Sequence, residues 1–131
     1  MTERRPLILL IEDDESLCRI VSRYLRGRGY DVEVASSVEA AVDALGRGVR
    51  PGLILLDLNL PGDTGWDFLR GDAIASAGSP PVVITSATTV HPKRLTEFAV
   101  AGYLPKPFPL ETLVATVERF AGPKETPAAH D

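Results

Sequence analysis

Five short apolar runs alternate along the chain with segments in which apolar residues recur at helical spacing, and this alternation is the strongest constraint on the fold. Strands that alternate with helices are typical of βαβ units, in which helices cover both faces of a parallel sheet. The runs interpreted as strands are residues 7–11, 32–35, 53–56, 82–85 and 103–104. The sequence therefore predicts an α/β fold, a (βα)5 doubly wound five-stranded parallel sheet.

The segments between these strands carry local signals for where helices begin. Asp14 is interpreted as a cap of the first helix, and Ser36, which a glutamate follows three residues later, as the capping box of the second. A third, short helix is expected to begin at Gly65 and a fourth near Pro92, whereas Pro109 is placed in the first turn of the fifth. Each strand is thus followed by one predicted helix.

The length of the chain, 131 residues, suits one domain that buries its own core. We expect this domain to span residues 1–121 and residues 122–131 to form a flexible tail or the start of a linker. Because the apolar runs are too short to cross a bilayer, we expect a cytoplasmic protein without a membrane partner. A net charge of −4 argues against direct nucleic-acid binding, since neutralising phosphates takes a surplus of Lys and Arg. The only cysteine, Cys18, is assigned a packing role.

Polar residues follow the predicted strands at their carboxyl ends, where open α/β sheets hold their ligands. Four acids in a row, beginning with Glu12 and Asp13, follow the first strand, and Asp57 follows the third. If these strands are neighbours, the three carboxylates can hold one Mg²⁺ ion. Ser86 and Lys106, at the ends of the last two strands, add donors for an anionic phosphoryl group. This set predicts phosphoryl chemistry with a carboxylate nucleophile.

Four sequence stretches, each at a predicted strand end, carry a resemblance to a known family. They read ILLIEDDE at residues 8–15, LLDLNLPG at 55–62, PVVITSA at 81–87 and YLPKPF at 103–108. With these motifs the chain resembles the receiver domains of two-component response regulators, from residue 7 to about residue 120. The resemblance implies a flavodoxin-like strand order 2-1-3-4-5 and a signalling role in place of an enzymatic one.

The resemblance also implies a role for each site residue. Asp57 would be the phosphoacceptor, Lys106 would contact the phosphoryl group, and Ser86 would turn toward it. Tyr103 would be the aromatic residue whose rotamer follows the switch. The implied ligands of Mg²⁺, or of Mn²⁺ in its place, are Glu12, Asp13, Asp57 and the main-chain carbonyl of Asn59.

Three details of the match have structural consequences. Thr85 and Ser86 are adjacent hydroxyls, and only one can face the site because a strand alternates its faces; the spacing from Pro81 selects Ser86. The segment 87–103 is shorter than in the family, so we expect a reduced fourth helix. In the family the peptide bond that corresponds to Lys106–Pro107 is cis, and we expect the same here.

The implied partners are a histidine kinase or a histidine phosphotransfer protein as phosphodonor. A downstream protein or a second copy of the chain would bind the face formed by the fourth helix, the fifth strand and the fifth helix.

Three alternatives compete with this interpretation. A Mg²⁺-dependent aspartyl-phosphate phosphatase or phosphotransferase of the haloacid dehalogenase type needs a second acid at the position of Asn59. The amide of Asn59 cannot serve as a general acid or base at neutral pH. A flavodoxin-like cofactor binder would need a loop rich in Ser, Thr and Gly where this chain has four acids. A receiver that only binds proteins would not require the intact set of site residues.

Overall fold

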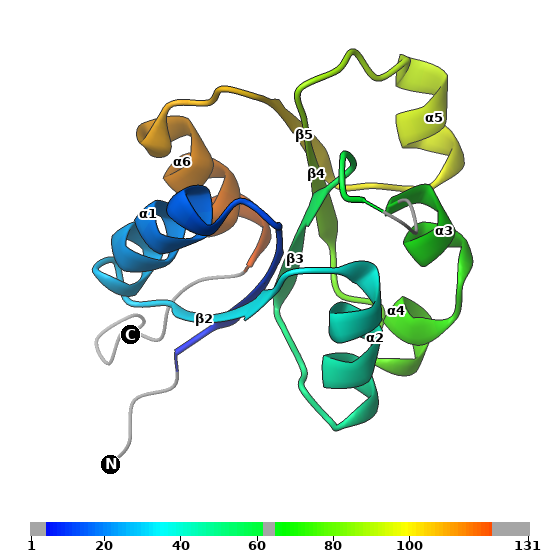
Figure 1. Cartoon of the computed structure of the whole chain (residues 1–131), viewed down its shortest axis with the longest axis horizontal. Coiled ribbons are helices and arrows are strands. Elements are labelled where there is room, and N and C mark those ends of the chain that lie inside the picture. Colours follow the sequence, from blue (N-terminus) through cyan, green and yellow to red (C-terminus); the bar gives the residue numbers. More distant parts are fainter. Residues whose placement is uncertain (1–4, 62–64, 122–131) are drawn as a thin grey trace, which may run out of the picture.

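The computed structural model describes residues 5–61 and 65–121 and contains a five-stranded parallel sheet. The strands are β1 (Leu7–Ile11), β2 (Asp31–Ala35), β3 (Leu53–Asp57), β4 (Val82–Ser86) and β5 (Gly102–Pro105). They lie side by side in the order β2-β1-β3-β4-β5 (Figure 1). The predicted strand order and the doubly wound α/β architecture are therefore confirmed.

Helices cover both faces of this sheet. They are α1 (Glu15–Arg26), α2 (Val38–Gly46), α3 (Gly65–Arg70), α4 (Ala73–Ser76), α5 (Pro92–Glu97) and α6 (Leu110–Phe120). In Figure 1, α1 and α6 lie on one side of the sheet and the other helices lie on the opposite side. The sheet is thus the middle layer of three.

The two faces of the central strands fill two separate hydrophobic clusters. Because successive strand residues point to opposite faces, Ile8 and Leu10 of β1 pack with the side chains of α1 and α6, whereas Leu9 and Ile11 pack with those of α2 and α3. Every residue of β3 is buried. Burial on both faces explains why these strands read as continuous apolar runs in the sequence.

The beginnings of two helices differ from the sequence-based prediction, and the third helical segment is divided. Ser37 rather than Ser36 caps α2, because its hydroxyl lies one helical turn from Ala40 and accepts that residue's N–H at 3.0 Å. Pro109 lies at the N-cap of α6, one position before the first turn. The return from β3 forms two short helices, α3 and α4, with Gly71 between them.

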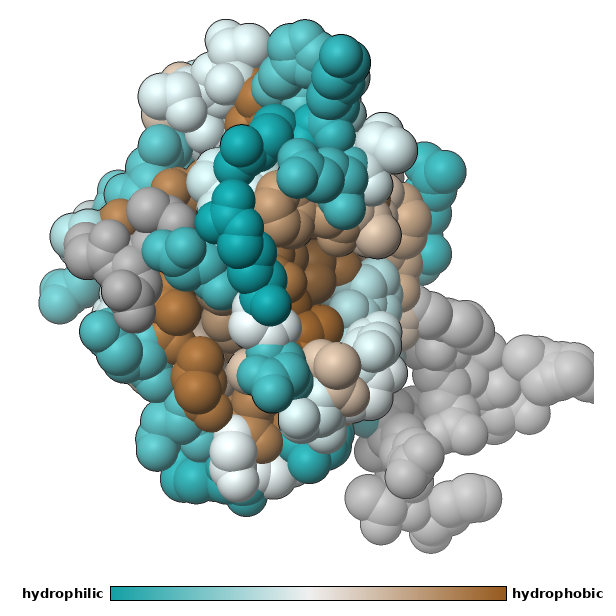
Figure 2. Space-filling model, turned by 90° about the vertical axis from the view of Figure 1, so that its right-hand side faces the viewer, coloured by the Kyte–Doolittle hydropathy of each residue, from teal (hydrophilic) through white to brown (hydrophobic). Residues whose placement is uncertain are grey.

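The helix α5 is short, as predicted, and has no fully buried residue. It is held against α3 largely by stacking: the Arg94 guanidinium lies 4.3 Å from the centre of the Trp66 ring, and the ring of Phe98 lies 5.0 Å from that of Trp66. The guanidinium of Arg70 lies over the Phe98 ring, 5.2 Å from its centre. On this side of the molecule, hydrophilic side chains lie across and around apolar ones (Figure 2). Cation–π contacts therefore contribute to the position of α5.

Among the described residues, no helix is long and apolar enough to cross a membrane. The tail predicted for residues 122–131 lies outside the described part of the chain, as do residues 62–64 of the turn after β3.

Candidate functional site

The carboxyl ends of the strands bring the predicted site residues to one edge of the sheet. Asp57 is the last residue of β3 and Ser86 the last of β4, while Glu12 and Lys106 directly follow β1 and β5. Because the strands are parallel and β1, β3, β4 and β5 lie in that order, these four positions meet at the same edge.

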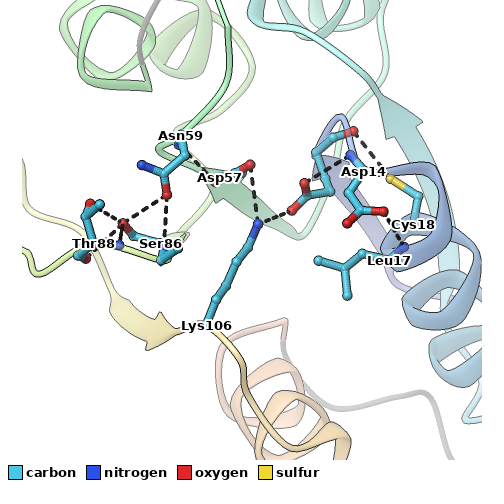
Figure 3. A network of polar contacts seen from close by, with 10 residues as sticks. Asp14, Leu17, Cys18, Asp57, Asn59, Ser86, Thr88 and Lys106 are labelled. Atoms are coloured by element: carbon cyan, nitrogen blue, oxygen red, sulfur yellow. Dashed lines mark hydrogen bonds and ion pairs between the residues drawn. The ribbon is translucent and has the colours of Figure 1, made fainter.

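Lys106 joins the two buried carboxylates of the site. Its ammonium nitrogen Nζ lies 2.7 Å from Oε1 of Glu12 and 3.4 Å from Oδ2 of Asp57 (Figure 3). Glu12 and Asp57 are only 3% and 2% exposed. The main-chain N–H of Lys106 donates to the carbonyl of Ser86, and the Lys106–Pro107 bond is cis, as predicted. One cation therefore compensates two buried anions, which leaves the group with a net negative charge.

Burial and charge shift the pKa values of this pair. Burial raises the pKa of Glu12 above its ordinary value, and the nearby negative charge of Asp57 adds to that effect; the hydrogen bonds from Lys106 and from the Asp14 N–H offset it only in part. Burial by itself would lower the pKa of Lys106, but its bond to Glu12 and the charge of Asp57 outweigh this, and the pKa is raised. The charged form of the Lys106 ammonium is thus favoured, whereas the charged form of Glu12 is less favourable than it would be in water.

Three carboxylates form a candidate metal centre. Glu12, Asp13 and Asp57 each offer an oxygen, and these oxygens lie within 4.8 Å of one another. An all-oxygen, anionic donor set at this spacing fits a hard divalent cation such as Mg²⁺. Asp14 has another task, because its Oδ1 accepts the N–H of Leu17 at 3.1 Å and caps α1, as predicted.

The opposite side of Asp57 is lined by the loops that follow β3 and β4. The N–H of Asn59 donates to Oδ1 of Asp57 at 2.9 Å, which folds that loop over the carboxylate. The hydroxyl of Ser86 lies 3.2 Å from Oδ1 of Asn59 and 2.9 Å from the carbonyl of Thr88 (Figure 3). Of the two adjacent hydroxyls, Ser86 is thus the one with contacts to this loop.

Tyr103 lies beyond this network but contacts it. The residue is partly buried, and its hydroxyl donates to the carbonyl of Thr88 at 3.2 Å. The same carbonyl accepts the hydroxyl of Ser86. Thr88, which the sequence analysis did not single out, therefore joins Ser86 to Tyr103.

Cys18 lies beneath the acidic cluster and has the predicted packing role. Its side chain belongs to the core between the sheet and α1, and its thiol donates to the carbonyl of Glu12 at 3.3 Å. Burial, together with the charges of the nearby acids, raises the pKa of this thiol to about 11. A thiol with such a pKa is protonated at neutral pH and a poor nucleophile.

The structure combines a doubly wound sheet with an acidic cluster, a hydroxyl and a lysine at one edge, and comparison with known proteins identifies the family. The family model "Response regulator receiver domain" matches residues 8–118. The chain therefore belongs to the response regulator receiver domain family.

Two relatives and one solved structure illustrate the similarity. The chain is 40% identical to the DNA-binding response regulator MtrA of Mycobacterium tuberculosis over 118 residues, which are 89% of this chain and 51% of that protein. It is 33% identical over 111 residues to the cell cycle transcriptional regulator CtrA of Caulobacter vibrioides, over 84% of this chain and 48% of the relative. The chain thus spans about half the length of these relatives. The structure of the chemotaxis protein CheY4 of Vibrio cholerae superposes with a TM-score of 0.80 at 28% identity, over 89% of this chain and 99% of the other.

Proposed function

We propose that this receiver domain, over residues 1–121, is a phosphoacceptor switch that takes a phosphoryl group onto Asp57 and signals by binding a protein. The observation that carries the proposal is the position of Asp57: a carboxylate that is 2% exposed, at a strand end, faces an ammonium and two further acids. Burying such a charge is unfavourable unless it serves a purpose, and this surrounding suits a nucleophile that must receive an anionic group.

In the proposed reaction a carboxylate oxygen of Asp57 attacks the phosphorus of a phosphohistidine on a histidine kinase or phosphotransfer protein. The new O–P bond forms as the P–N bond breaks, the imidazole leaves with its electron pair, and an acyl phosphate remains on Asp57. Lys106 lies 3.4 Å from Asp57 and is positioned to donate to a phosphoryl oxygen. Mg²⁺, or Mn²⁺, held by Glu12, Asp13, Asp57 and the carbonyl of Asn59 would supply further charge neutralisation.

The same arrangement argues against turnover of small phosphate esters by a phosphatase or phosphotransferase. Such an enzyme needs an acid–base group near the nucleophile, and the position that would provide it holds Asn59. The oxygen of that amide already accepts the N–H of Ala87 at 2.9 Å and lies 3.2 Å from the hydroxyl of Ser86. We therefore propose a cytoplasmic signalling domain that promotes only its own phosphorylation and dephosphorylation, without direct contact to nucleic acid or membrane.

Replacing Asp13 by Asn should weaken Mg²⁺ binding at least about tenfold, because it removes one charged ligand of a three-carboxylate site. Replacing Asp14 by Asn is the matched control: Asp14 caps α1, and Asn caps a helix equally well, so Mg²⁺ affinity should change little. Both affinities can be measured by calorimetric titration of the metal-free protein. Equal losses in the two variants would show that Asp13 has no special place in the site.

For the output we propose a chain of contacts from Ser86 through Thr88 to Tyr103. A phosphoryl group on Asp57 would draw the Ser86 hydroxyl away from the Thr88 carbonyl, which also accepts the hydroxyl of Tyr103. Tyr103 would then reorient and change the face formed by α5, β5 and α6, where a downstream protein or a second copy of the chain would bind. Because α5 has only six residues, β5 and α6 would provide most of this face.

Adding beryllofluoride and Mg²⁺, which mimic the phosphoryl group, should therefore change amide hydrogen exchange between Ser86 and Phe108 as well as around Asp57. The reason is that a ligand shifts an equilibrium only through contacts that differ between the two states, and in the proposed switch the contact of Ser86 with the Thr88 carbonyl is lost in one of them. Hydrogen exchange followed by mass spectrometry measures this, with Asp57→Asn as the control that should show no change. A response restricted to the peptides around Asp57 would contradict the proposed output route.

A further inference from the structure

The side chain of Asn59 makes contacts that its main-chain role does not require. Its amide oxygen Oδ1 accepts the N–H of Ala87 at 2.9 Å and lies 3.2 Å from the hydroxyl of Ser86 (Figure 3). A main-chain N–H can only donate, so the oxygen of the amide, and not its nitrogen, must face Ala87. The neutral amide oxygen from the β3 loop is thus bound by the N–H of Ala87, and it shares the single proton of the Ser86 hydroxyl with the carbonyl of Thr88, which lies closer at 2.9 Å.

These donors are the ones that a phosphoryl group on Asp57 would need. Such a group adds three acceptor oxygens beside the carboxylate, and charge-assisted hydrogen bonds from protein donors stabilise them. The ammonium of Lys106 lies 3.4 Å from Asp57, and the hydroxyl of Ser86 and the N–H of Ala87 are donors at the end of the neighbouring strand β4. The Asn59 oxygen already accepts the Ala87 N–H and competes with the Thr88 carbonyl for the Ser86 proton.

We propose that the amide oxygen of Asn59 is an internal ligand that occupies the place of a phosphoryl oxygen until Asp57 is phosphorylated. The inference rests on the proposed function and adds a residue that sets the affinity of the site. On phosphorylation, the hydrogen bonds from Ala87 and Ser86 pass from neutral oxygens, those of the Asn59 amide and the Thr88 carbonyl, to a charged phosphoryl oxygen. Charge-assisted hydrogen bonds are about twice as strong as neutral ones, so this exchange favours the phosphoryl group.

The displaced amide has a place to go. Beside Asn59 lies an open hollow of about 430 Å³ whose lining includes Trp66, Thr88, His91 and Arg94. An amide turned into this hollow can exchange hydrogen bonds with water and with these polar side chains. The side chain of Asn59 thus has two positions, and the position seen in the structure belongs to the unphosphorylated state.

An internal ligand lowers the affinity for an external one, because part of the binding free energy is used to displace it. The probe is beryllofluoride, titrated at saturating Mg²⁺. Trp66 is the only tryptophan of the chain and lines the hollow, so its fluorescence can report binding. Asn59→Ala should bind beryllofluoride about fivefold more tightly than the wild type, as expected for removal of one or two competing hydrogen bonds. Unchanged or weaker binding by Asn59→Ala would overturn the proposal.

A double-mutant cycle with Ser86→Ala separates competition from a general change in the loop. Competition for the Ser86 hydroxyl predicts that Asn59→Ala gains less affinity in the Ser86→Ala background than in the wild type. An equal gain in both backgrounds would mean that Asn59 does not act through the Ser86 hydroxyl.

Amide exchange at Ala87 in the absence of any ligand provides a second test. Asn59→Ala should expose this N–H and speed its exchange, whereas Asn59→Asp keeps an acceptor oxygen in place and should preserve the protection. Equal exchange in the wild type and in Asn59→Ala would contradict the proposed contact even if one of the variants were less stable.

The two proposals can fail separately. Wild-type protein that does not bind beryllofluoride through Asp57 contradicts the proposed function. Normal wild-type binding without tightening in Asn59→Ala contradicts only the internal ligand.

Discussion

Asp57→Asn should abolish phosphorylation by acetyl phosphate in the presence of Mg²⁺, whereas the wild-type protein should gain one phosphoryl group. The group would be held in an acyl phosphate, which is stable in acid and labile in base. The reason is chemical: only the carboxylate oxygen is nucleophilic enough to form this bond, and an amide of the same shape is not. Mass spectrometry of the intact protein measures both the gain and its loss after base treatment.

Asp57→Asn is a conservative test of this point because the amide can still accept the N–H of Asn59 at its oxygen. Asp14→Asn, the same chemical change at a helix cap, should be phosphorylated like the wild type and serves as the control. If the Asp57→Asn variant were labelled to the same extent as the wild type, another residue would have to be the phosphoacceptor.

Lys106→Met should reduce the free energy of unfolding by about 3 kcal/mol at pH 8 without metal, since removing one partner of a buried ion pair leaves unpaired charge. Here the loss concerns two carboxylates, because the ammonium lies 2.7 Å from Glu12 and 3.4 Å from Asp57. Urea unfolding in the presence of a chelator measures the effect. Lys93→Met, at an exposed position on α5, is the control and should change stability by less than about 0.5 kcal/mol.

The pH dependence of this loss has a definite sign. The pKa of Glu12 is already raised in the folded protein, and without Lys106 it loses the hydrogen bond that lowers it, so it rises further. An acid whose folded pKa is raised favours folding when protonated, and that contribution disappears as the pH rises from 4.5 through the folded pKa. The destabilisation by Lys106→Met should therefore be largest at neutral pH and shrink as the pH falls toward 4.5. A loss that stayed constant between pH 5 and pH 8 would contradict this account.

The predictions from sequence succeeded where a local pattern has only one structural solution. Continuous apolar runs such as residues 53–56 have to be buried on both faces, and a carboxylate that follows such a run lies at the sheet edge. From this the strand positions, the parallel sheet and the gathering of Glu12, Asp57, Ser86 and Lys106 could be anticipated. The cap of α2 was misplaced by one residue because Ser36 and Ser37 are adjacent and both suit a cap.

Contacts that depend on how far a side chain reaches were not predictable in this way. Glu12 and Lys106 are 94 residues apart, and nothing in either neighbourhood indicates that their side chains pair. Asn59 was assigned through its main-chain carbonyl alone, whereas its amide oxygen contacts the other loop. The stacking of Arg94 on Trp66 likewise follows from the placement of two short helices with weak sequence signals.

The parallel sheet separates an edge that carries the candidate site from an edge that carries only connections. Asp57 and the residues around it lie at the carboxyl ends of strands, whereas the connections from helices back to strands, such as the one through Gly48, run along the opposite edge. Gly48 has a φ of +104° and open space where a Cβ would be, and it makes no contact with the site. Insertions at that edge can lengthen the chain without touching the chemistry. A fluorophore or an affinity handle can therefore be attached there without contact to the reactive edge.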